Sequence, residues 1–408
     1  MKSRIVWTTT ILLVASVVIN YVDRGNLSVA APVLKTELAL SPARLGVLLS
    51  AFFWTYASCQ LVSGWLVDRF DANWVLAAGF FLWSSATAAT GLAWGFASLL
   101  VVRLLVGVAE SVAYPAYSKI FATHFAENHR GIANALIDAG SKVGPAGGAL
   151  VGGFFIARFG WRPFFIILGL GALPWLPCWF KWQPRGAPAA PHQAEVRPSF
   201  REILAHRAAW ATCVGLFCGN YFWYFLLSWL PSYFVQERHF SLQNMGIAGS
   251  ATYLFTAATT TVAGCLSYRA LAAGASPTKV RKLCVSLGLA LATIIVVVPL
   301  ITNPRIAVAV LILASMGYGI FSSSHWAITQ TIAGPAAVGR WTGMQNFVGN
   351  LSGVVAPLLT GFVVQATGQF FWAFVVIGAV TLTGSLSFLF GLGRVEPIRW
   401  RRPAASAA

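Results

Sequence analysis

The chain has 408 residues, of which 57% are hydrophobic and only 10% are charged, and its formal net charge is +17. Soluble globular proteins carry about 25% charged residues, so this composition excludes an ordinary soluble domain. The apolar surplus predicts a protein that faces lipid, with the bilayer as its solvent. The sequence contains no zinc-ligand, recognition-helix or RNA-binding motif, so the positive charge does not indicate a nucleic-acid partner.

Twelve apolar runs are long enough to cross about 30 Å of hydrocarbon as helices. The first run resembles a signal peptide because Lys2 and Arg4 precede it, but it is too long and contains Asp23 and Arg24. We therefore expect it to be the first membrane span. In chain order the runs cover residues 5–31, 43–67, 74–94, 96–118, 131–157, 162–182, 209–234, 245–268, 281–301, 306–332, 341–366 and 370–393.

The basic residues predict the orientation of these spans. Of the 28 Lys and Arg residues, 19 fall in connections or tails on the side of the N-terminus. Six fall on the opposite side, namely Lys35, Arg44, Arg158, Arg162, Arg238 and Arg305, and three fall inside spans, namely Arg24, Arg103 and Lys142. Because cytoplasmic loops carry the excess of Lys and Arg, both termini and the hydrophilic loop at 183–208 are expected in the cytoplasm.

Two internal repeats indicate that the chain consists of two related halves. Gly64 to Asp68-Arg69 follows the second span, and Gly264 to Tyr268-Arg269 recurs 200 positions later, after the eighth. Small residues also recur at steps of four in the fifth and eleventh spans, at Gly140, Gly144, Gly148 and Gly152 and at Gly349, Gly353, Pro357 and Gly361. Such stripes let two helices approach closely. We expect an N-terminal six-helix bundle at 1–182, a cytoplasmic loop at 183–208 and a C-terminal six-helix bundle with a short cytoplasmic tail at 209–408.

Four motifs give the chain a resemblance to a known family. They are Asn20-Tyr21-Val22-Asp23-Arg24, Gly64 to Asp68-Arg69, Arg103-x6-Glu110-x4-Pro115 and Trp229-Leu230-Pro231-x-Tyr233. With them the chain resembles a major facilitator superfamily transporter, and more narrowly the anion:cation symporters that carry sugar acids, phthalate or sialic acid. The resemblance implies an all-α membrane fold of twelve helices in two pseudo-symmetric bundles. The sequence departs from the usual loop motif, because Asp71 replaces a glycine and Trp74 stands where a basic residue is common.

Charged residues inside the spans are the main candidates for function, since each costs several kcal/mol in hydrocarbon. They are Asp23, Arg24, Arg103, Glu110, Asp138 and Lys142, all in the first half. Arg103, Glu110 and Tyr114 share one helix face, with Asp23 and Arg24 expected at about the depth of Arg103. The bases could bind an organic anion, Arg103 in a bidentate manner, and a proton on Asp23 or Glu110 would restore neutrality. In the alternative interpretation, Asp23 and Arg24 hold each other, and so do Asp138 and Lys142, which are four residues apart.

The family resemblance implies further site residues. Tyr21, Tyr56, Trp326 and Asn346 correspond to positions that line the family's site, and Gly64, Asp68 and Arg69 correspond to a gating loop. The expected substrate-binding set is therefore Tyr21, Arg24, Tyr56, Arg103, Lys142, Trp326 and Asn346, with Asp23 and Glu110 as proton-coupling residues. His325 is expected to be a packing residue.

Together these features predict a secondary active transporter, a proton-coupled symporter of a small organic anion such as a hexonate, a hexuronate or another carboxylate. We expect a monomer in the cell's inner membrane. We expect no metal or cofactor, because the six cysteines are separate and no histidine cluster accompanies them. An exporter or exchanger of anions is the alternative among transporters. A membrane enzyme would need a nucleophile and base, or metal ligands, at matching depth, and the third alternative is a membrane nutrient sensor that no longer transports.

Overall fold

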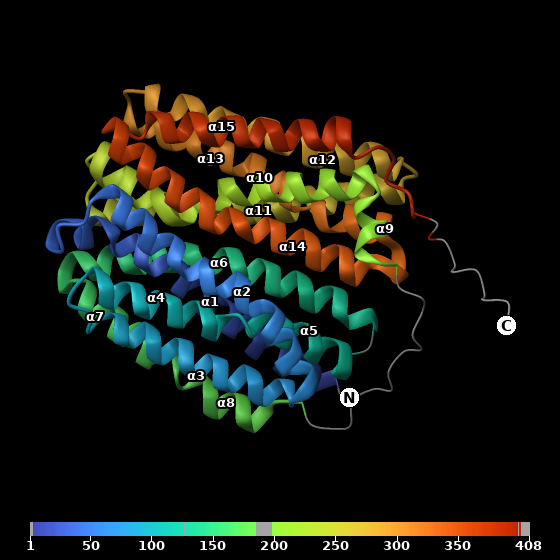
Figure 1. The fold of residues 1–408 in the computed structure, drawn as a ribbon, viewed down its shortest axis with the longest axis horizontal. Helices are drawn as coiled ribbons and strands as arrows, with labels where there is room; N and C mark the ends of the chain where they lie inside the picture. Colours follow the sequence, from blue (N-terminus) through green and yellow to red (C-terminus); the bar gives the residue numbers. More distant parts are fainter. Residues whose placement is uncertain (1–2, 126, 185–197, 399, 401–408) are drawn as a thin grey trace. The chain divides into compact units, whose positions relative to one another are not determined.

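A computed structural model describes residues 3–125, 127–184, 198–398 and 400, and the part described consists of helices and their connections, with no strand (Figure 1). Half of the predicted central loop, residues 185–197 with Arg185 and Arg197, lies outside the described residues, as do Lys2, Arg399, Arg401 and Arg402. The helices are α1 Ser3–Glu37, α2 Pro42–Arg69, α3 Ala72–Thr90, α4 Phe96–Glu110, α5 Ala113–His124, α6 Glu127–Phe159, α7 Trp161–Ala172, α8 Trp175–Trp182, α9 Phe200–Leu204, α10 Arg207–Ser232, α11 Leu242–Ala272, α12 Pro277–Ala292, α13 Pro304–Ser322, α14 His325–Thr367 and α15 Phe371–Leu386.

Each of the twelve predicted runs corresponds to a helical segment. Seven segments meet length and hydropathy criteria for a membrane span: Phe96–His124, Trp161–Trp182, Arg207–Glu237, Pro277–Leu300, Pro304–Gly334, Ala336–Thr367 and Phe371–Gly391. The helix α2 is bent, and it is an eighth span of this kind if its two parts are taken together. The other helices of span length within the described residues, α1, α3, α6 and α11, have 35, 19, 33 and 31 residues. Charged and polar side chains lower the hydropathy of α1 and α6, and several of these side chains form the site described below.

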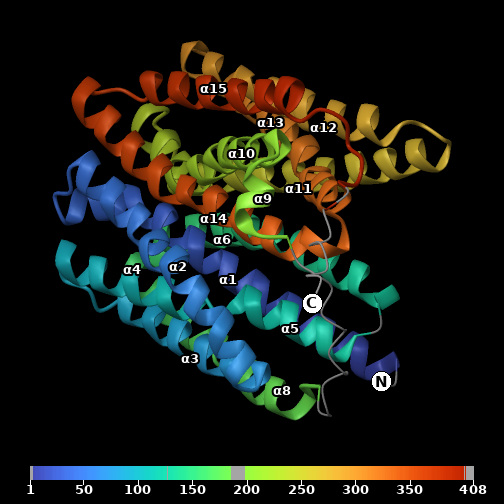
Figure 2. The same cartoon turned by 45° about the vertical axis from the view of Figure 1, so that its right-hand side comes forward.

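The helices form two compact units. The first unit comprises Met1–Ala190, Tyr224–Leu254 and Gly353–Ala373, and the second comprises Pro191–Trp223, Phe255–Ser352 and Phe374–Ala408. Parts of α10, α11 and α14 therefore belong to the first unit, together with α1 to α8. Figure 2 shows the helices of the chain from a second side. The division of the chain into two repeated bundles at 1–182 and 209–408 concerns sequence symmetry and stays a prediction.

The glycine stripe of α6 packs against α1 within the first unit, as the sequence predicts. A methyl group added at Gly140 would lie 2.6 Å from Cγ1 of Val17, and one added at Gly144 would lie 2.6 Å from the carbonyl oxygen of Val18. Only a residue without a side chain permits this approach. The stripe thus holds α1, which carries Asp23 and Arg24, tightly against its neighbour.

Two glycine pairs mark further close crossings in the first unit. Gly46 of α2 faces Gly361 of α14, and a methyl group on Gly46 would lie 2.8 Å from the carbonyl oxygen of Pro357. Gly153 of α6 faces Gly246 of α11, where a methyl group on Gly246 would lie 2.7 Å from the carbonyl oxygen of Ala149. Gly46 and Gly246 are 200 positions apart, which is the spacing of the internal repeat. The repeat predicted from the sequence would place the two crossings at equivalent positions.

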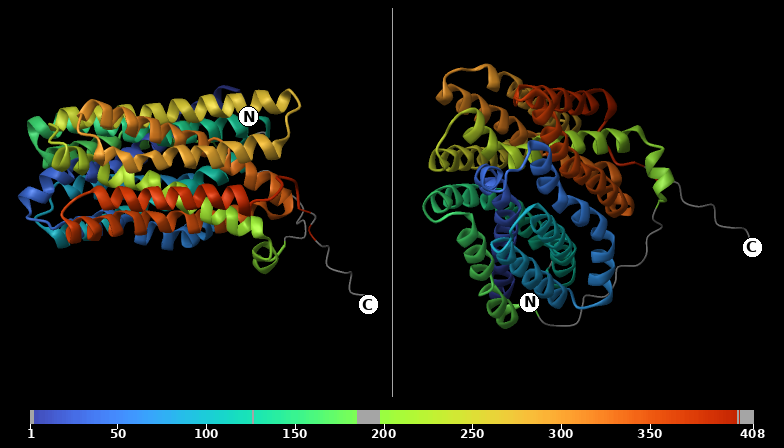
Figure 3. Two further views of the ribbon diagram at one scale, coloured as in Figure 1. Left: turned by 90° about the horizontal axis from the view of Figure 1, so that it is seen from above. Right: turned by 60° about the vertical axis from the view of Figure 1, so that its left-hand side comes forward.

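The second unit contains its own helix pairs, such as α12 and α13, which lie side by side (Figure 3). Between α13 and the long part of α14, Gly334 adopts φ 62° and ψ 178° and separates the span ending there from the one that follows. The end of the chain caps this break. The backbone N–H of Ile398 donates to the carbonyl of Ile332 at 2.9 Å, and Nε1 of Trp400 donates to the carbonyl of Ala333 at 2.8 Å. These bonds satisfy carbonyl groups that a helix end leaves without partners.

Candidate functional site

Glu110 lies at a break in the fourth membrane segment. α4 ends at Glu110, Ser111 and Val112 follow, and α5 begins at Ala113. Pro115 explains the break, because a proline has no N–H to donate to the carbonyl four residues earlier, that of Ser111. The hydroxyl of Ser111 forms a 2.6 Å hydrogen bond with that of Ser63 on α2. The sequence thus interrupts the helix directly beside a buried carboxyl group.

Arg24 and Glu110 form a buried ion pair. Nε of Arg24 donates to Oε2 of Glu110 at 3.0 Å, and the two side chains are 2% and 0% exposed. The guanidinium also lies against aromatic rings, with its carbon 4.4 Å from the ring centre of Tyr56, 4.7 Å from that of Tyr21 and 5.2 Å from that of Phe52. Ring faces attract cations most strongly where water is excluded. Tyr21 and Tyr56, two aromatic residues predicted for the site, therefore contact the predicted basic residue Arg24.

Asp23 and Arg103 are linked through an amide. Nη2 of Arg103 donates to Oδ1 of Asn26 at 3.2 Å, and Nδ2 of Asn26 donates to Oδ1 of Asp23 at 3.2 Å. All three side chains are buried. Asp23 thus connects to Arg103 through Asn26, whereas Arg24 pairs with Glu110, so the alternative interpretation in which Asp23 and Arg24 hold each other is not the arrangement in the structure. Adjacent residues of a helix project about 100° apart, so Asp23 and Arg24 face different neighbours.

Several buried polar atoms in this cluster have no hydrogen-bond partner. They are Nη2 of Arg24, Nε of Arg103, Oδ2 of Asp23, Oε1 of Glu110 and both amide atoms of Asn20. Buried polar groups normally find partners, so unpaired ones mark a site where another molecule or a rearrangement completes the set. Two unpaired guanidinium N–H groups suit a carboxylate, and two unpaired carboxyl oxygens suit protons.

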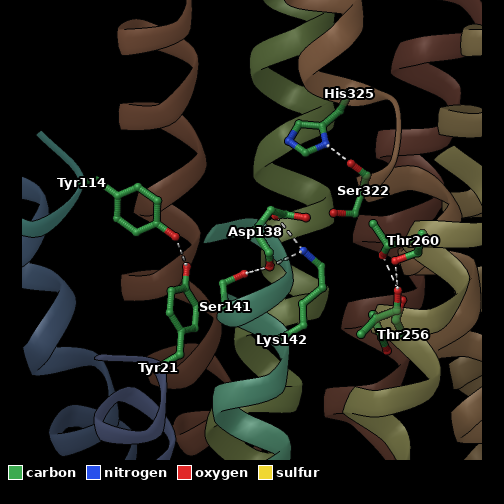
Figure 4. A network of polar contacts seen from close by, with 11 residues as sticks. Tyr21, Tyr114, Asp138, Ser141, Lys142, Thr256, Thr260, Ser322 and His325 are labelled. Atoms are coloured by element: carbon green, nitrogen blue, oxygen red, sulfur yellow. Dashed lines mark hydrogen bonds and ion pairs between the residues drawn. The ribbon is translucent and has the colours of Figure 1, made fainter. Parts of the chain in front are cut away.

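Tyr21 and Lys142 have further partners in the first unit (Figure 4). The hydroxyl of Tyr114 on α5 donates to that of Tyr21 at 3.3 Å. Nζ of Lys142 donates to Oδ1 of Asp138, one turn earlier on α6, at 2.7 Å. The lysine side chain is 6% exposed and the aspartate 54%. The alternative interpretation, in which these two residues pair with each other, is the arrangement in the structure.

The predicted residues of the second half, Trp326 and Asn346, lie in the second unit. The ring of Trp326 lies 4.7 Å from that of His325, which stacks on Phe321 at 5.0 Å. Nδ1 of His325 is 3.1 Å from the carbonyl oxygen of Ser322, so the expected packing role suits this histidine (Figure 4). Asn346 is half-buried, and its carbonyl accepts a bond from Asn350.

The predicted gating loop lies at the end of α2. Asp68 pairs with Lys119 of α5 at 2.7 Å, Arg69 is exposed, and Gly64 has open space around it. Asp71 gains a local role from its departure from the family motif, because its carboxyl group accepts a bond from the N–H of Asn73 and caps α3. Trp74, in place of a basic residue, lies 4.8 Å from the ring of Phe180.

Sequence analysis missed three members of the cluster. Asn20, Asn26 and Phe52 were not predicted as site residues, yet Asn26 holds two predicted ones. The available signal was polarity, because Asn20 and Asn26 are buried amides in an apolar span, spaced three residues before and after Asp23. Among the described residues, no group of His, Cys, Asp or Glu could hold a metal ion.

The chain is similar in sequence to known sugar-acid transporters. Over 97% of its length the chain is 27% identical to a probable galactarate/D-glucarate transporter of Bacillus subtilis, covering 94% of that protein. It is 28% identical to the D-galactonate transporter of Escherichia coli, with 96% of each chain covered, and 28% identical to the hexuronate transporter of B. subtilis, with 91% of each covered.

Solved structures show the same fold. An inward-facing, unoccupied bacterial homologue of the human lysosomal transporter Spinster matches with a TM-score of 0.78 and 19% identity, over 96% of this chain and 95% of that one. The predicted fold class, an all-α membrane protein of twelve spans, is confirmed, and the family and the relatives are transporters rather than enzymes. Because residues 13–357 match its family model, the chain belongs to the Major Facilitator Superfamily of multi-pass membrane transporters.

Proposed function

We propose that this transporter couples the uptake of a small sugar acid to protons. The observation that carries the proposal is the buried cluster of Asp23, Arg24, Arg103 and Glu110, which has equal numbers of acids and bases and an unpaired polar atom on each. A bound carboxylate would leave this cluster with one negative charge in excess. One proton would restore the balance, which matters where water is excluded.

The membrane potential favours the same coupling. Moving one negative charge inward against a potential of about 100 mV costs about 2.3 kcal/mol. A proton carried with the anion removes this cost. The relatives named for galactarate, galactonate and hexuronate support a hydroxylated carboxylate as the substrate class. In this proposal Tyr21, Tyr56, Lys142, Trp326 and Asn346 complete the binding set.

The proposal includes a location and a gate. The transporter would lie in the inner membrane as a monomer, with both termini in the cytoplasm, because that side holds most of the basic residues. Gly64, Asp68 and Arg69 would act at the cytoplasmic gate, with the exposed pair of Asp68 and Lys119 forming and breaking between states.

Transport into proteoliposomes tests the proposal. Purified protein should accumulate labelled D-galactonate, D-glucarate or D-galacturonate when an inward proton gradient is imposed, and it should exchange them without one. Thermal stabilisation by these acids, but not by galactose or galactitol, should accompany transport. Equal stabilisation by the uncharged sugars would contradict anion recognition, and accumulation that ignores the proton gradient would contradict proton coupling.

A further inference from the structure

The amide of Asn26 occupies the only described hydrogen-bonded path between Asp23 and Arg103. It is fully buried, it donates to the carboxyl group from Nδ2, and it accepts from the guanidinium at Oδ1. Both bonds are 3.2 Å long. A primary amide has a donor end and an acceptor end, so its orientation depends on which charges face it.

The two charges fix the amide in one orientation. If it turned over, Nδ2 would face the N–H groups of Arg103, and Oδ1 would face an oxygen of the Asp23 carboxylate. Each of these contacts would join like partners, and in a buried site that costs more than in water. Asn26 therefore holds Arg103 in this position for as long as Asp23 carries its negative charge.

Protonation of Asp23 weakens this hold. A hydrogen bond to an ionised group is roughly twice as strong as one between neutral groups. A neutral Asp23 also no longer attracts Arg103 electrostatically, and its new O–H can turn the amide by donating to Oδ1. We propose that Asn26 is a positioning residue that couples the charge of Asp23 to Arg103, so that a proton on Asp23 releases the guanidinium to bind a substrate carboxylate.

Other titratable or charged groups act on Asp23 or lie on the helices packed against α1, and their effects must be separated from that of Asp23 in a test. Glu110 and Arg103 of α4 interact with it electrostatically, and Thr87 of α3 contributes a hydroxyl. Arg24, on the same helix as Asp23, forms its ion pair with Glu110. Four helices packed on α1 carry further titratable groups. α6 carries the pair Asp138 and Lys142, and α2 carries the phenol of Tyr56. α7 carries Arg162, whose guanidinium pairs with Glu37, and α8 carries the amine of Lys181. Glu110 is the second carboxyl group of the cluster, so its titration has to be removed.

The experiment uses full-length protein with Glu110→Gln as the background, so that Asp23 becomes the proton-dependent member of the cluster. The dissociation constant of D-galactonate is measured by calorimetry at about pH 6 and about pH 8. In this background the affinity should be at least about fivefold higher at the lower pH, a typical coupling between two linked sites. This inference rests on the proposed function.

Asn26→Leu in the same background should abolish the difference. Leucine has a similar volume but cannot hold Arg103, so the affinity at about pH 8 should rise to within about twofold of that at about pH 6. A gain of affinity at high pH is not a result of general damage to the fold. Asn26→Ala should give the same result and serves if the leucine variant does not fold. As a matched control, Asn73→Leu removes a buried amide that, within the described residues, donates to the carbonyl of Pro184, and it should leave the pH dependence unchanged.

Two outcomes contradict different claims. If the Glu110→Gln background already binds with the same affinity at both pH values, Asp23 carries no coupled proton and the proposed function loses that residue. If the background shows the pH dependence and the Asn26 variants keep it in full, the coupling through Asn26 is overturned while the proposed function stands.

Discussion

Arg24 and Glu110, which are 86 positions apart in the chain, meet in a buried ion pair whose guanidinium is enclosed by aromatic rings. Removing one partner of a buried pair leaves an uncompensated charge, which costs about 3–5 kcal/mol. A neutral isostere of the acid avoids part of this cost, because it still accepts a hydrogen bond. The pair can therefore be tested for proton transfer separately from its role in folding.

Glu110→Gln should keep exchange and weaken driven uptake. The glutamine oxygen can still accept the bond from Arg24, but the side chain cannot carry a proton, which leaves Asp23 as the carrier. Counterflow of labelled galactonate should persist, whereas a gradient of one pH unit should support clearly less than an accumulation of about tenfold. Both are measured in proteoliposomes. Asp23→Asn should behave alike, because a neutral side chain at this position also leaves Arg103 free to bind the substrate carboxylate. Full gradient-driven accumulation by both variants would exclude these acids as the coupling site.

Arg103→Lys should weaken substrate binding with little change in stability. Lysine keeps the charge but loses the planar pair of N–H groups that matches a carboxylate. A charged hydrogen bond contributes about 1.5–3 kcal/mol, so affinity should fall by about 10- to 100-fold. Arg44→Lys, at an exposed position on α2, is the matched control. Affinity close to that of the unaltered protein would assign Arg103 a structural role.

Tyr56→Leu should impair the site more than Tyr56→Phe. The ring of Tyr56 lies 4.4 Å from the guanidinium carbon of Arg24, and phenylalanine keeps that face whereas leucine does not. Loss of a desolvated cation–π contact costs about 2 kcal/mol, so the leucine variant should bind about 30-fold more weakly. Binding is measured by calorimetry. If the phenylalanine variant is impaired as much, the hydroxyl rather than the ring is the group that matters.

Gly46→Ala and Gly246→Ala should each force a helix crossing apart. The added methyl groups would lie 2.8 and 2.7 Å from backbone carbonyl oxygens, which cannot move as a side chain can. Overpacking of this kind costs about 1–3 kcal/mol, so thermal stability in detergent should fall. Gly147→Ala on α6 has open space and should be neutral or stabilising. Unchanged stability in both crossing variants would show that the helices separate there without cost.

Trp400→Ala should loosen the second unit alone. The indole donates to the carbonyl of Ala333 and packs edge-on against Trp341 and His206. Loss of one hydrogen bond and of the apolar contact should lower the free energy of unfolding by about 1–3 kcal/mol. Thermal unfolding measures this, with galactonate affinity as the control that should not change. A large loss of affinity would assign the tail a part in transport.

Sequence analysis predicted the helices well and their partners poorly. Hydropathy and length located every span, because a membrane leaves few ways to satisfy the backbone. The helical period also placed Arg103 and Glu110 on one face, but it could not show the break after Glu110 that separates Tyr114 from them. The period could not show that Arg24 pairs with Glu110 while Asp23 hydrogen-bonds with Asn26, because these contacts depend on how α1 and α4 pack. Attention to charged residues alone overlooked Asn26, although a buried amide in hydrocarbon also requires a partner.

The distance in sequence between α1 and its partners affects how the protein is made. During synthesis, Arg24 can pair with Glu110 only after residue 110 has been made, and Asn26 can bond with Arg103 only after the chain has grown by 77 positions. At about 5–20 residues per second, synthesis of the intervening chain takes roughly 4–16 seconds. Until then α1 exposes an arginine and an aspartate that the lipid interior disfavours. The first helix must therefore remain beside the insertion machinery, or in the aqueous interface, until the fourth helix emerges, so that the residues proposed for transport also set the order of membrane assembly.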